Sequence, residues 1–201
     1  MENRKIRIAI THGETNGIGY ELIFKTFAET EMLEMCTPII YGSPKVAAYH
    51  RKALDIPANF SIISRAEDAQ DGRINLLTCF DEEVKVDLSL PTEESSKAAV
   101  KALERAIEDG RKGLYNALVV GPTAATSLSS GNGRTESIAD YLGRKFDNKD
   151  GGLTIFNSYK MRVASVNESA DMKKAIGNIS RNLIEKKATT MYNALKRDLL
   201  L

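Results

Sequence analysis

The chain has 201 residues, enough for one good-sized domain or two small lobes. Hydrophobic residues make up 42% and charged residues 27%, and the net charge is +1, so neither a nucleic-acid-binding field nor a disordered acidic chain is indicated. The apolar runs are too short to span a bilayer and the N-terminus is charged, so we expect a cytoplasmic protein with no membrane and no nucleic-acid partner. Cys36 and Cys79 stand in separate apolar stretches and are expected as buried free thiols.

The first predicted strand and the turn after it are the most informative stretch. Apolar residues alternate through Ile6–Ile10, which predicts a strand. Gly13, Gly17 and Gly19 follow within seven residues, and helical spacing resumes over Glu21–Phe27. A strand, a glycine-rich turn and a helix form the first half of a βαβ unit, whose ligands bind outside the carboxyl ends of the strands. The glycine spacing is not the dinucleotide fingerprint Gly-x-Gly-x-x-Gly.

Strands and helices alternate along the rest of the chain. The predicted strands are 37–42, 60–63, 74–80, a short edge strand at 85–88, 117–122, and a pair at 153–156 and 161–166. The predicted helices are 45–54, with Ser43 as N-cap and Pro44 in the first turn, 97–112, 136–142, and 172–196 with an irregularity at Gly177; loops are predicted at 123–135 and 148–152.

This alternation predicts an α/β protein with a three-layer α/β/α arrangement and a mixed, mostly parallel sheet. The continuous apolar run at 117–122 predicts a strand buried on both faces. We place the boundary between the two lobes after residue 122, giving a lobe at 1–122 with the glycine-rich turn and a partial second lobe at 123–201.

The opening stretch resembles the 4-hydroxythreonine-4-phosphate dehydrogenase family, which typically begins Ile-Thr-Pro-Gly-Asp-Pro-Ala-Gly-Ile-Gly-Pro-Glu. Here residues 10–21 read ITHGETNGIGYE, and the later strings PIIYGSPKV and LVVGP also resemble the family. The resemblance covers nearly the whole chain. It implies an NAD-dependent and metal-dependent oxidoreductase of pyridoxal phosphate synthesis, a two-lobed fold related to isocitrate and isopropylmalate dehydrogenases but truncated, and a homodimer with its active site near the interface.

The chain departs from the family where the chemistry is expected. Family members are longer and bind a divalent metal through three histidines. Their Gly-His-Thr-Glu segment is here Gly133–Glu136 with Arg134 in place of the histidine, and a later histidine is replaced by Ser169. Arginine offers no lone pair to a metal and serine is a poor ligand. We therefore expect no bound divalent metal and no catalytic residue here, and NAD is implied by the resemblance alone. Of the two histidines, His12 lies in the glycine-rich turn and His50 is expected at the surface.

Five residues are candidates for binding a substrate: His12, Glu14, Thr126, Ser127 and Arg134. His12 could face a ligand or be solvated, and Glu14 could accept a ligand hydroxyl or cap the following helix. Arg134 could bind a phosphate or carboxylate, or pair with Glu136 or Asp140. Thr126 and Ser127 could hydrogen-bond a phosphate.

Three functional hypotheses follow. The chain could be a shortened, metal-less member of the family with weak or no activity. It could be a dehydrogenase completed by a partner chain, since an exposed sheet edge invites pairing. It could also be a module that binds a small anion, such as a phosphorylated ligand, or another protein.

Overall fold

The computed structural model describes residues 5–81, 83–123, 129–130, 134–135, 138–147, 152–166 and 176–197. The chain divides into two compact units, Met1–Thr135 and Glu136–Leu201, and each is described by itself. The lobe boundary placed after residue 122 stays a prediction. In the described ranges, no helix is long and apolar enough to cross a membrane.

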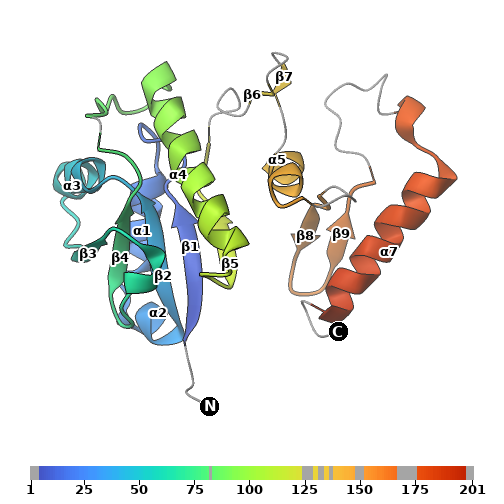
Figure 1. Ribbon diagram of the computed structural model, residues 1–201, viewed down its shortest axis with the longest axis horizontal. Coiled ribbons are helices and arrows are strands. Elements are labelled where there is room, and N and C mark those ends of the chain that lie inside the picture. The colour runs from blue at the N-terminus through green and yellow to red at the C-terminus, as the bar shows by residue number, and fades with distance from the viewer. Residues whose placement is uncertain are drawn as a thin grey trace. The chain divides into compact units, whose positions relative to one another are not determined.

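Unit 1 is built on a five-stranded sheet with the order β3-β4-β2-β1-β5 (Figure 1). Every pairing within this sheet is parallel. Its strands are β1 (Ile6–Thr11), β2 (Cys36–Gly42), β3 (Phe60–Ile63), β4 (Ile74–Thr78) and β5 (Ala117–Val120). The helices are α1 (Gly19–Thr26), α2 (Thr30–Met35), α3 (Pro44–Ala53), the 3₁₀ turn η1 (Ala66–Asp68) and α4 (Glu93–Arg111).

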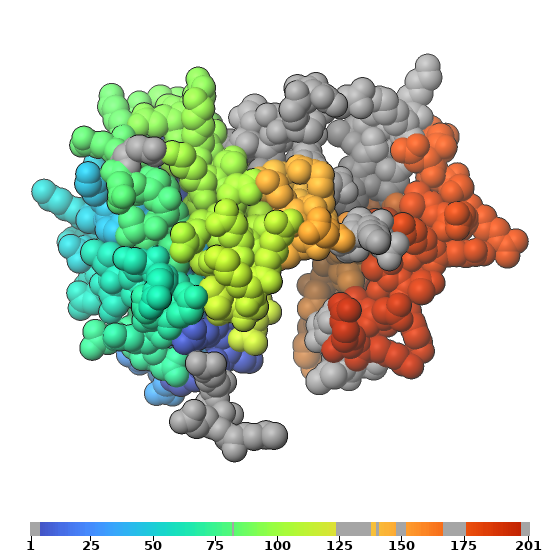
Figure 2. Space-filling model, in the orientation of Figure 1, coloured from blue at the N-terminus to red at the C-terminus, as the bar shows by residue number. Residues whose placement is uncertain are grey.

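Alternation along the strands divides the core of unit 1 between the two faces of the sheet. On β2, Ile40 packs in the cluster that holds α1 and α3 residues, whereas its neighbours Ile39 and Tyr41 pack in the cluster that holds Ala102 and Ala106 of α4. The helix α4 packs over the central strands on one face (Figure 1), and its side chains form part of the outer surface of unit 1 there (Figure 2). The predicted three-layer α/β/α arrangement is therefore confirmed for unit 1.

Strand β5 corrects one prediction. It lies at the edge of the sheet and pairs with β1 alone among the described strands. Ala117 and Val119 are exposed, Val119 by 49% of its surface, so the expectation of burial on both faces is wrong. A continuous apolar run reports hydrophobicity, but it does not report how many neighbours a strand will find.

The segment 85–88, predicted as an edge strand, forms no strand. The N–H of Asp87 donates instead to the side-chain oxygen of Asn16, at 3.0 Å, and the N–H of Ser89 donates to the Asn16 carbonyl oxygen, at 2.9 Å. This segment is thus attached to the glycine-rich turn rather than to a neighbouring strand.

Helix ends differ from the predictions where capping decides them. α4 begins at Glu93, earlier than predicted, because Thr92 and Ser95 form a reciprocal capping box in which each hydroxyl accepts the other residue's N–H. Ser43 stands at the N-cap position of α3 as predicted, yet its side chain makes no capping hydrogen bond. α2 was not predicted; this short helix contains no buried residue.

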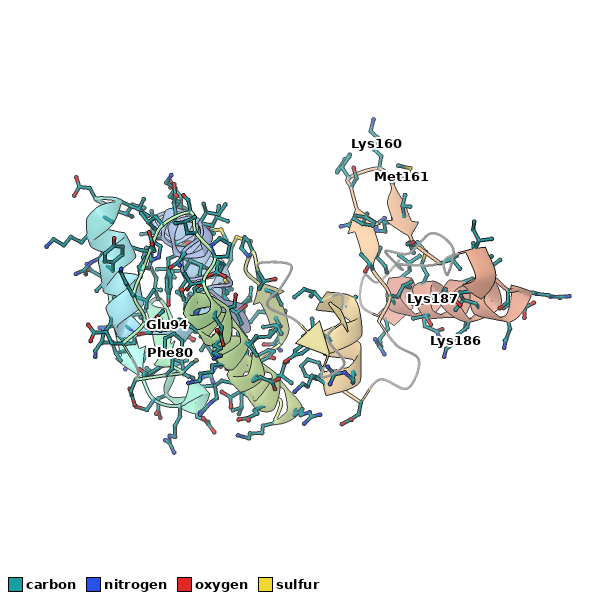
Figure 3. The ribbon with its side chains drawn as sticks, turned by 90° about the horizontal axis from the view of Figure 1, so that it is seen from above. Phe80, Glu94, Lys160, Met161, Lys186 and Lys187 are labelled. Carbon is teal, nitrogen blue, oxygen red and sulfur yellow. The ribbon has the colours of Figure 1, made fainter. Side chains whose placement is uncertain are left out.

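Unit 2 contains α5 (Ile138–Lys145), a hairpin of β8 (Ile155–Asn157) and β9 (Arg162–Ala164), and α7 (Arg181–Arg197). The hairpin confirms the predicted strand pair, and it forms a separate antiparallel sheet. Lys160 and Met161 lie at its tip, and Lys186 and Lys187 lie on α7 (Figure 3). The predicted helix 172–196 is interrupted at residues 179–180, near the irregularity expected at Gly177. No described residue of α7 is buried.

The loop predicted at 123–135 contains two short strands, β6 (Ser129–Ser130) and β7 (Arg134–Thr135). They pair in antiparallel register, with Ser130 opposite Arg134. The loop prediction is wrong at these four positions.

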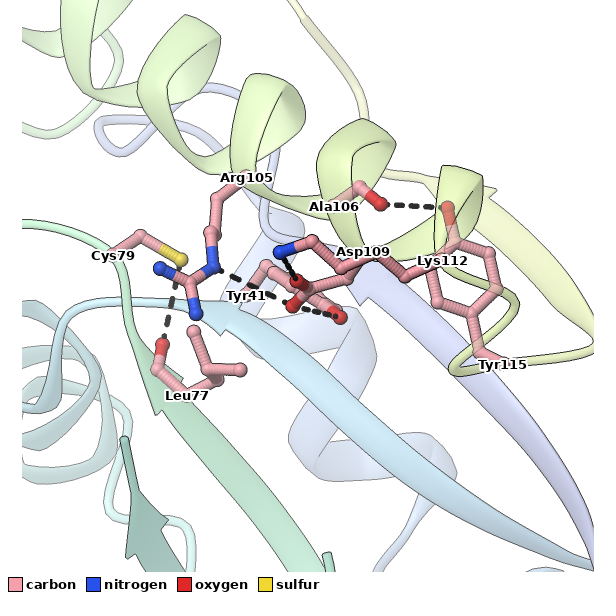
Figure 4. Close-up of polar contacts among 8 residues, drawn as sticks. All are labelled: Tyr41, Leu77, Cys79, Arg105, Ala106, Asp109, Lys112 and Tyr115. Atoms are coloured by element: carbon pink, nitrogen blue, oxygen red, sulfur yellow. Dashed lines mark hydrogen bonds and ion pairs between the residues drawn. The ribbon is translucent and has the colours of Figure 1, made fainter. Parts of the chain in front are cut away.

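A buried carboxylate joins α4 to the sheet. Asp109 is 1% exposed, and the Tyr41 hydroxyl donates to it at 3.0 Å (Figure 4). Arg105 of α4 and Lys112, the residue that follows the helix, lie 3.4 and 3.6 Å from the Asp109 oxygens. Cys79, a free and half-buried thiol, donates to the Leu77 carbonyl oxygen beside this network, and burial raises its pKa to about 12. The other free thiol, Cys36, is buried as predicted.

The Asp109→Ala substitution is expected to lower the free energy of unfolding by about 2–3 kcal/mol, because it leaves the buried Tyr41 hydroxyl without its acceptor. Glu108→Ala is the matched control, since Glu108 is the exposed neighbour on the same helix and should behave as a neutral surface substitution. Urea unfolding of both variants measures the difference. Equal losses would show that the network does not stabilise the α4 packing.

Candidate functional site

The order of the strands identifies the carboxyl ends of β1 and β5 as the place for a ligand. β1 continues through α1 to β2 on one side, while β5, which arrives after α4, pairs with β1 on the other side. The turns that follow β1 and β5 therefore flank a topological switch point. In open parallel sheets, ligands bind at the carboxyl ends of the strands at such a point.

The two turns contact each other through their backbones. The Glu14 N–H donates to the Pro122 carbonyl oxygen at 2.7 Å, and the Gly121 N–H donates to the Thr11 carbonyl oxygen at 3.0 Å. Gly13 has φ of +71°, and a Cβ there would lie 2.1 Å from the Pro122 oxygen. A Cβ on Gly121 would lie 2.4 Å from the Thr11 oxygen. Glycine is thus required on both sides of this contact.

The third glycine of the turn fixes where α1 begins. A Cβ on Gly19 would lie 1.7 Å from the His12 carbonyl oxygen, so the first residue of the helix packs directly on the end of β1. The prediction that these glycines allow a close backbone approach is confirmed, and the close approach is to this chain's own backbone.

His12 points into the core rather than toward solvent. Its side chain is fully buried, stacked on the Tyr20 ring with 5.1 Å between centroids and edge-on to Phe80 at 6.1 Å. Phe80 is labelled in Figure 3. Neither ring nitrogen has a hydrogen-bond partner among the described residues, and burial lowers the pKa of His12 to about 4. The alternative of a solvated turn histidine is therefore wrong.

His50, expected at the surface, is buried as well, with 1% of its surface exposed. Its Nε2 lies 2.7 Å from the Thr15 carbonyl oxygen. A carbonyl can only accept, so His50 carries its proton on Nε2 and binds α3 to the glycine-rich turn. The neighbouring basic residues Arg51 and Lys52 are exposed, and they suggested a surface position for the whole segment.

Glu14 is 8% exposed, and its Oε1 accepts the Asn16 N–H at 3.3 Å. The helix α1 has no side-chain capping hydrogen bond, so Glu14 does not cap it. Its Oε2 and the Thr15 hydroxyl are buried with no hydrogen-bond partner in the described ranges. Buried polar atoms are ordinarily satisfied by protein, water or ligand.

Asn16 is a residue that sequence reasoning missed. Its Nδ2 donates to the Leu90 carbonyl oxygen at 2.7 Å while its Oδ1 accepts from Asp87, so it joins the turn to the segment before α4. Asparagine in a glycine-rich turn was the available signal, since its amide can satisfy two backbone groups at once.

The structure places His12 and Glu14 in one turn and brings the backbone of Arg134 into β7. Thr126, Ser127 and Ser169 lie outside the described residues, as do the alternative partner Glu136 and positions 148–151 of the turn predicted at 148–152. The ligand-binding roles of these residues stay predictions.

The residues in hand do not fit the metal centre that the resemblance implies. The chain has two histidines, and both imidazoles lie within the core of unit 1. The described ranges contain no group of three or more His, Cys, Asp or Glu residues that could hold a metal ion. No chemical step is therefore assigned to a metal in this chain.

The fold and the glycine-rich turn define a class of protein: an open parallel α/β sheet covered on both faces, with this turn at its switch point. Residues 34–201 match the family model described as "Pyridoxal phosphate biosynthetic protein PdxA". The 4-hydroxythreonine-4-phosphate dehydrogenase of Bacteroides thetaiotaomicron is 45% identical over 198 residues, which cover 98% of this chain and 54% of that protein. This chain belongs to the PdxA family.

Solved structures agree on the fold. The crystal structure of 4-hydroxythreonine-4-phosphate dehydrogenase from Klebsiella pneumoniae matches with a TM-score of 0.79 and 17% identity, covering 98% of this chain and 60% of that one. The enzyme from Burkholderia phymatum matches with a TM-score of 0.76 and 19% identity, covering 93% and 57%. This chain thus spans little more than half the length of these relatives.

The Gly13→Ala substitution is expected to cost at least about 2 kcal/mol more stability than Gly113→Ala, because overpacking against Pro122 adds to the backbone strain. Gly113 is a matched control: its φ is also +71°, but nothing lies within 4 Å of a Cβ there. Urea unfolding of both variants separates the two effects. Similar losses would mean that the contact between the two turns relaxes without cost.

Acid is expected to destabilise unit 1 through His12. Its pKa is about 4 when folded against 6.5 ordinarily, so the unfolded chain binds the proton more readily and stability falls as pH drops from 6.5 to 4. His12→Phe should remove about 3 kcal/mol of this loss, at up to about 1.4 kcal/mol per pH unit. Urea unfolding between pH 7 and 4 tests this. Parallel curves for the two proteins would show that His12 is protonated equally in both states.

Proposed function

We propose that this chain uses the PdxA scaffold to bind a small phosphorylated ligand at the β1–β5 switch point, and that it does not by itself carry out a metal-dependent dehydrogenation. The first part rests on the family, whose matched relatives include enzymes named for 4-hydroxythreonine 4-phosphate. That compound has a phosphate, an ammonium group, a carboxylate and one free hydroxyl. The ligand class proposed for this chain has the same groups.

Unsatisfied polar atoms at the turn support a polar ligand. The Oε2 of Glu14 and the Thr15 hydroxyl lack partners among the described residues, directly beside the switch point. A carboxylate oxygen is a suitable acceptor for an ammonium or hydroxyl group. The phosphate would be held by Arg134, whose guanidinium can make paired hydrogen bonds, and by the hydroxyls of Thr126 and Ser127.

The position of the two histidines carries the second part of the proposal. His12 is enclosed by Tyr20 and Phe80, and His50 is hydrogen-bonded to the Thr15 carbonyl oxygen. Without an accessible imidazole, and with Arg134 and Ser169 where the resemblance implies histidines, this chain lacks the donors for the family's metal. A metal in such a reaction polarises the substrate oxygens, so its loss removes a large part of the rate.

A second candidate function is that of one half of a dehydrogenase, which a partner chain would complete. It is favoured by β5, an edge strand with a half-exposed Val119, in a chain that covers 54% of its Bacteroides relative. The partner would then pair with β5 and contribute the missing ligands.

The deciding experiment combines titration and assay. Chelator-stripped protein is titrated with Zn²⁺, Co²⁺ and Mg²⁺ by calorimetry, and then assayed for NADH formation with 4-hydroxythreonine 4-phosphate and NAD. We expect no stoichiometric metal binding and no NADH above the blank. NADH formation that a chelator abolishes would overturn the proposal. Activity that appears only after mixing with the remaining portion of the Bacteroides relative would establish the second candidate.

Ligand binding is tested separately with the same phosphorylated compound in the absence of NAD. Arg134→Gln should weaken binding by about tenfold or more, the usual effect of losing a charge-assisted contact. Arg181→Gln is the matched control, because Arg181 is an exposed arginine paired with Glu185 on α7. Equal affinity in both variants would exclude Arg134 from the phosphate site.

A further inference from the structure

A cavity of about 390 Å³ opens in unit 1 where β3 and β4 begin. Because all strands of this sheet are parallel, the cavity lies at the amino ends of the strands, whereas the glycine-rich turn lies at their carboxyl ends. Its walls come from the end of α1, from α2, from the segment between α3 and β3, and from the first residues of β3 and β4. Its volume falls at the small end of the range typical of small-molecule sites.

Aromatic and aliphatic side chains form the wall of this cavity. The rings of Phe24 and Phe60 lie parallel, 8° apart in orientation and 6.1 Å apart at their centroids, and Phe27 lies on the same wall. Phe24 and Phe27 are buried in the core, so they hold their positions without a ligand. The remaining apolar lining includes Leu33, Ala58 and Ile74. Such a wall suits a flat ring, which can pack face-on or edge-on against phenylalanine.

A guanidinium stands at the rim of the cavity. Arg73 lines it and donates one hydrogen bond, from Nη1 to the Ser61 hydroxyl at 3.4 Å. Arginine has five donors, and within the described ranges Arg73 has no carboxylate partner. The nearest acid along the chain, Asp71, accepts a hydrogen bond from Thr37.

A second guanidinium adds to the positive charge. Arg51 lies over the Phe60 ring, 5.7 Å from its centroid, and its Nη1 donates to the Ala58 carbonyl oxygen at 3.2 Å. Both Ala58 and Phe60 line the cavity. Arg73 lines the cavity and Arg51 lies against its lining residue Phe60. Neither arginine has a carboxylate partner among the described residues, which favours an anionic ligand over a neutral or cationic one.

We propose that this cavity binds a small aromatic anion: a single ring carrying one short anionic arm, with the ring on the phenylalanine wall and the arm on Arg73. A carboxylate and a phosphate share this chemistry. The site is separate from the switch point and does not depend on the function proposed there.

The test uses phenylacetate, phenyl phosphate and the neutral 2-phenylacetamide as probes, each titrated into the ¹⁵N-labelled full chain. We expect both anions to shift the amide signals of Gly72, Arg73 and Ile74, and to leave those of Gly13 and Gly17 unchanged. 2-Phenylacetamide should bind at least tenfold more weakly than phenylacetate. The tighter of the two anions identifies whether the natural arm is a carboxylate or a phosphate.

Two matched variants locate the charge. Arg73→Gln should weaken both anions at least tenfold and leave the affinity for 2-phenylacetamide unchanged, because only the anionic arm uses the guanidinium. Arg65→Gln, at an exposed arginine that pairs with Asp68 outside the cavity, should leave all affinities unchanged. Arg73 is exposed, so its variant is expected to keep a folded spectrum.

Several outcomes would overturn this proposal. They are the absence of binding at millimolar anion, equal affinity for phenylacetate and 2-phenylacetamide, unchanged affinity in Arg73→Gln, and shifts confined to the Gly13–Gly19 turn. The last outcome would leave the switch-point site standing, and an unchanged ligand affinity in Arg134→Gln would leave the cavity standing. The two proposals therefore fail independently.

Discussion

The close contact between the turns after β1 and β5 is the constraint that determines the arrangement of the chain at the carboxyl ends of these strands. Gly13 and Gly121 each bring one backbone within contact of the other, and the hydrogen bonds from Glu14 and Gly121 fasten the two turns together. This contact fixes the path of the chain into α1, where Gly19 packs on the His12 carbonyl. The position of every side chain in the turn then follows from a backbone that has little freedom left.

One consequence is that the His12 side chain, at the start of the turn, points into the core. His12 stacks on Tyr20, whose ring also stacks on His50 at 5.3 Å, so three rings lie in series beneath the turn. The Tyr20 hydroxyl accepts the Ser43 N–H at 3.1 Å, which joins this stack to the beginning of α3. Gly42 completes the arrangement, since a Cβ there would lie 2.2 Å from the Tyr20 hydroxyl. The two histidines are thus part of the packing of α1 and α3 on the sheet.

The sequence was sufficient for features that depend on local pattern. Alternating apolar residues placed β1 and β3, and Gly42 marked the end of β2. It was insufficient for features that depend on distant partners. The burial of His50 depends on the Thr15 carbonyl, and the path of 85–88 depends on the side chain of Asn16. Neither partner is near in sequence, so neither interaction leaves a periodic signal.

The candidate site likewise has features that the sequence could predict and features that it could not. The glycines predicted the close backbone approach at the turn because the need for glycine arises from the local backbone conformation. The orientation of His12 could not be read from the sequence, because a histidine beside glycines suits either solvent or an aromatic cluster. The ring that decides the matter, Phe80, follows β4, far along the chain.

Completion of the fold and completion of a metal site are separate requirements. In unit 2, Phe156 and Val163 form a cross-strand pair that is 65% and 47% exposed, and α7 buries no described residue. Two three-residue strands are too few to be stable alone, so this unit gains most from added apolar contact. A partner of the kind proposed as the second candidate would cover these apolar side chains and pair with β5. It would not release His12 or His50 from the core of unit 1, so a metal-dependent reaction would require the partner to bring its own histidines.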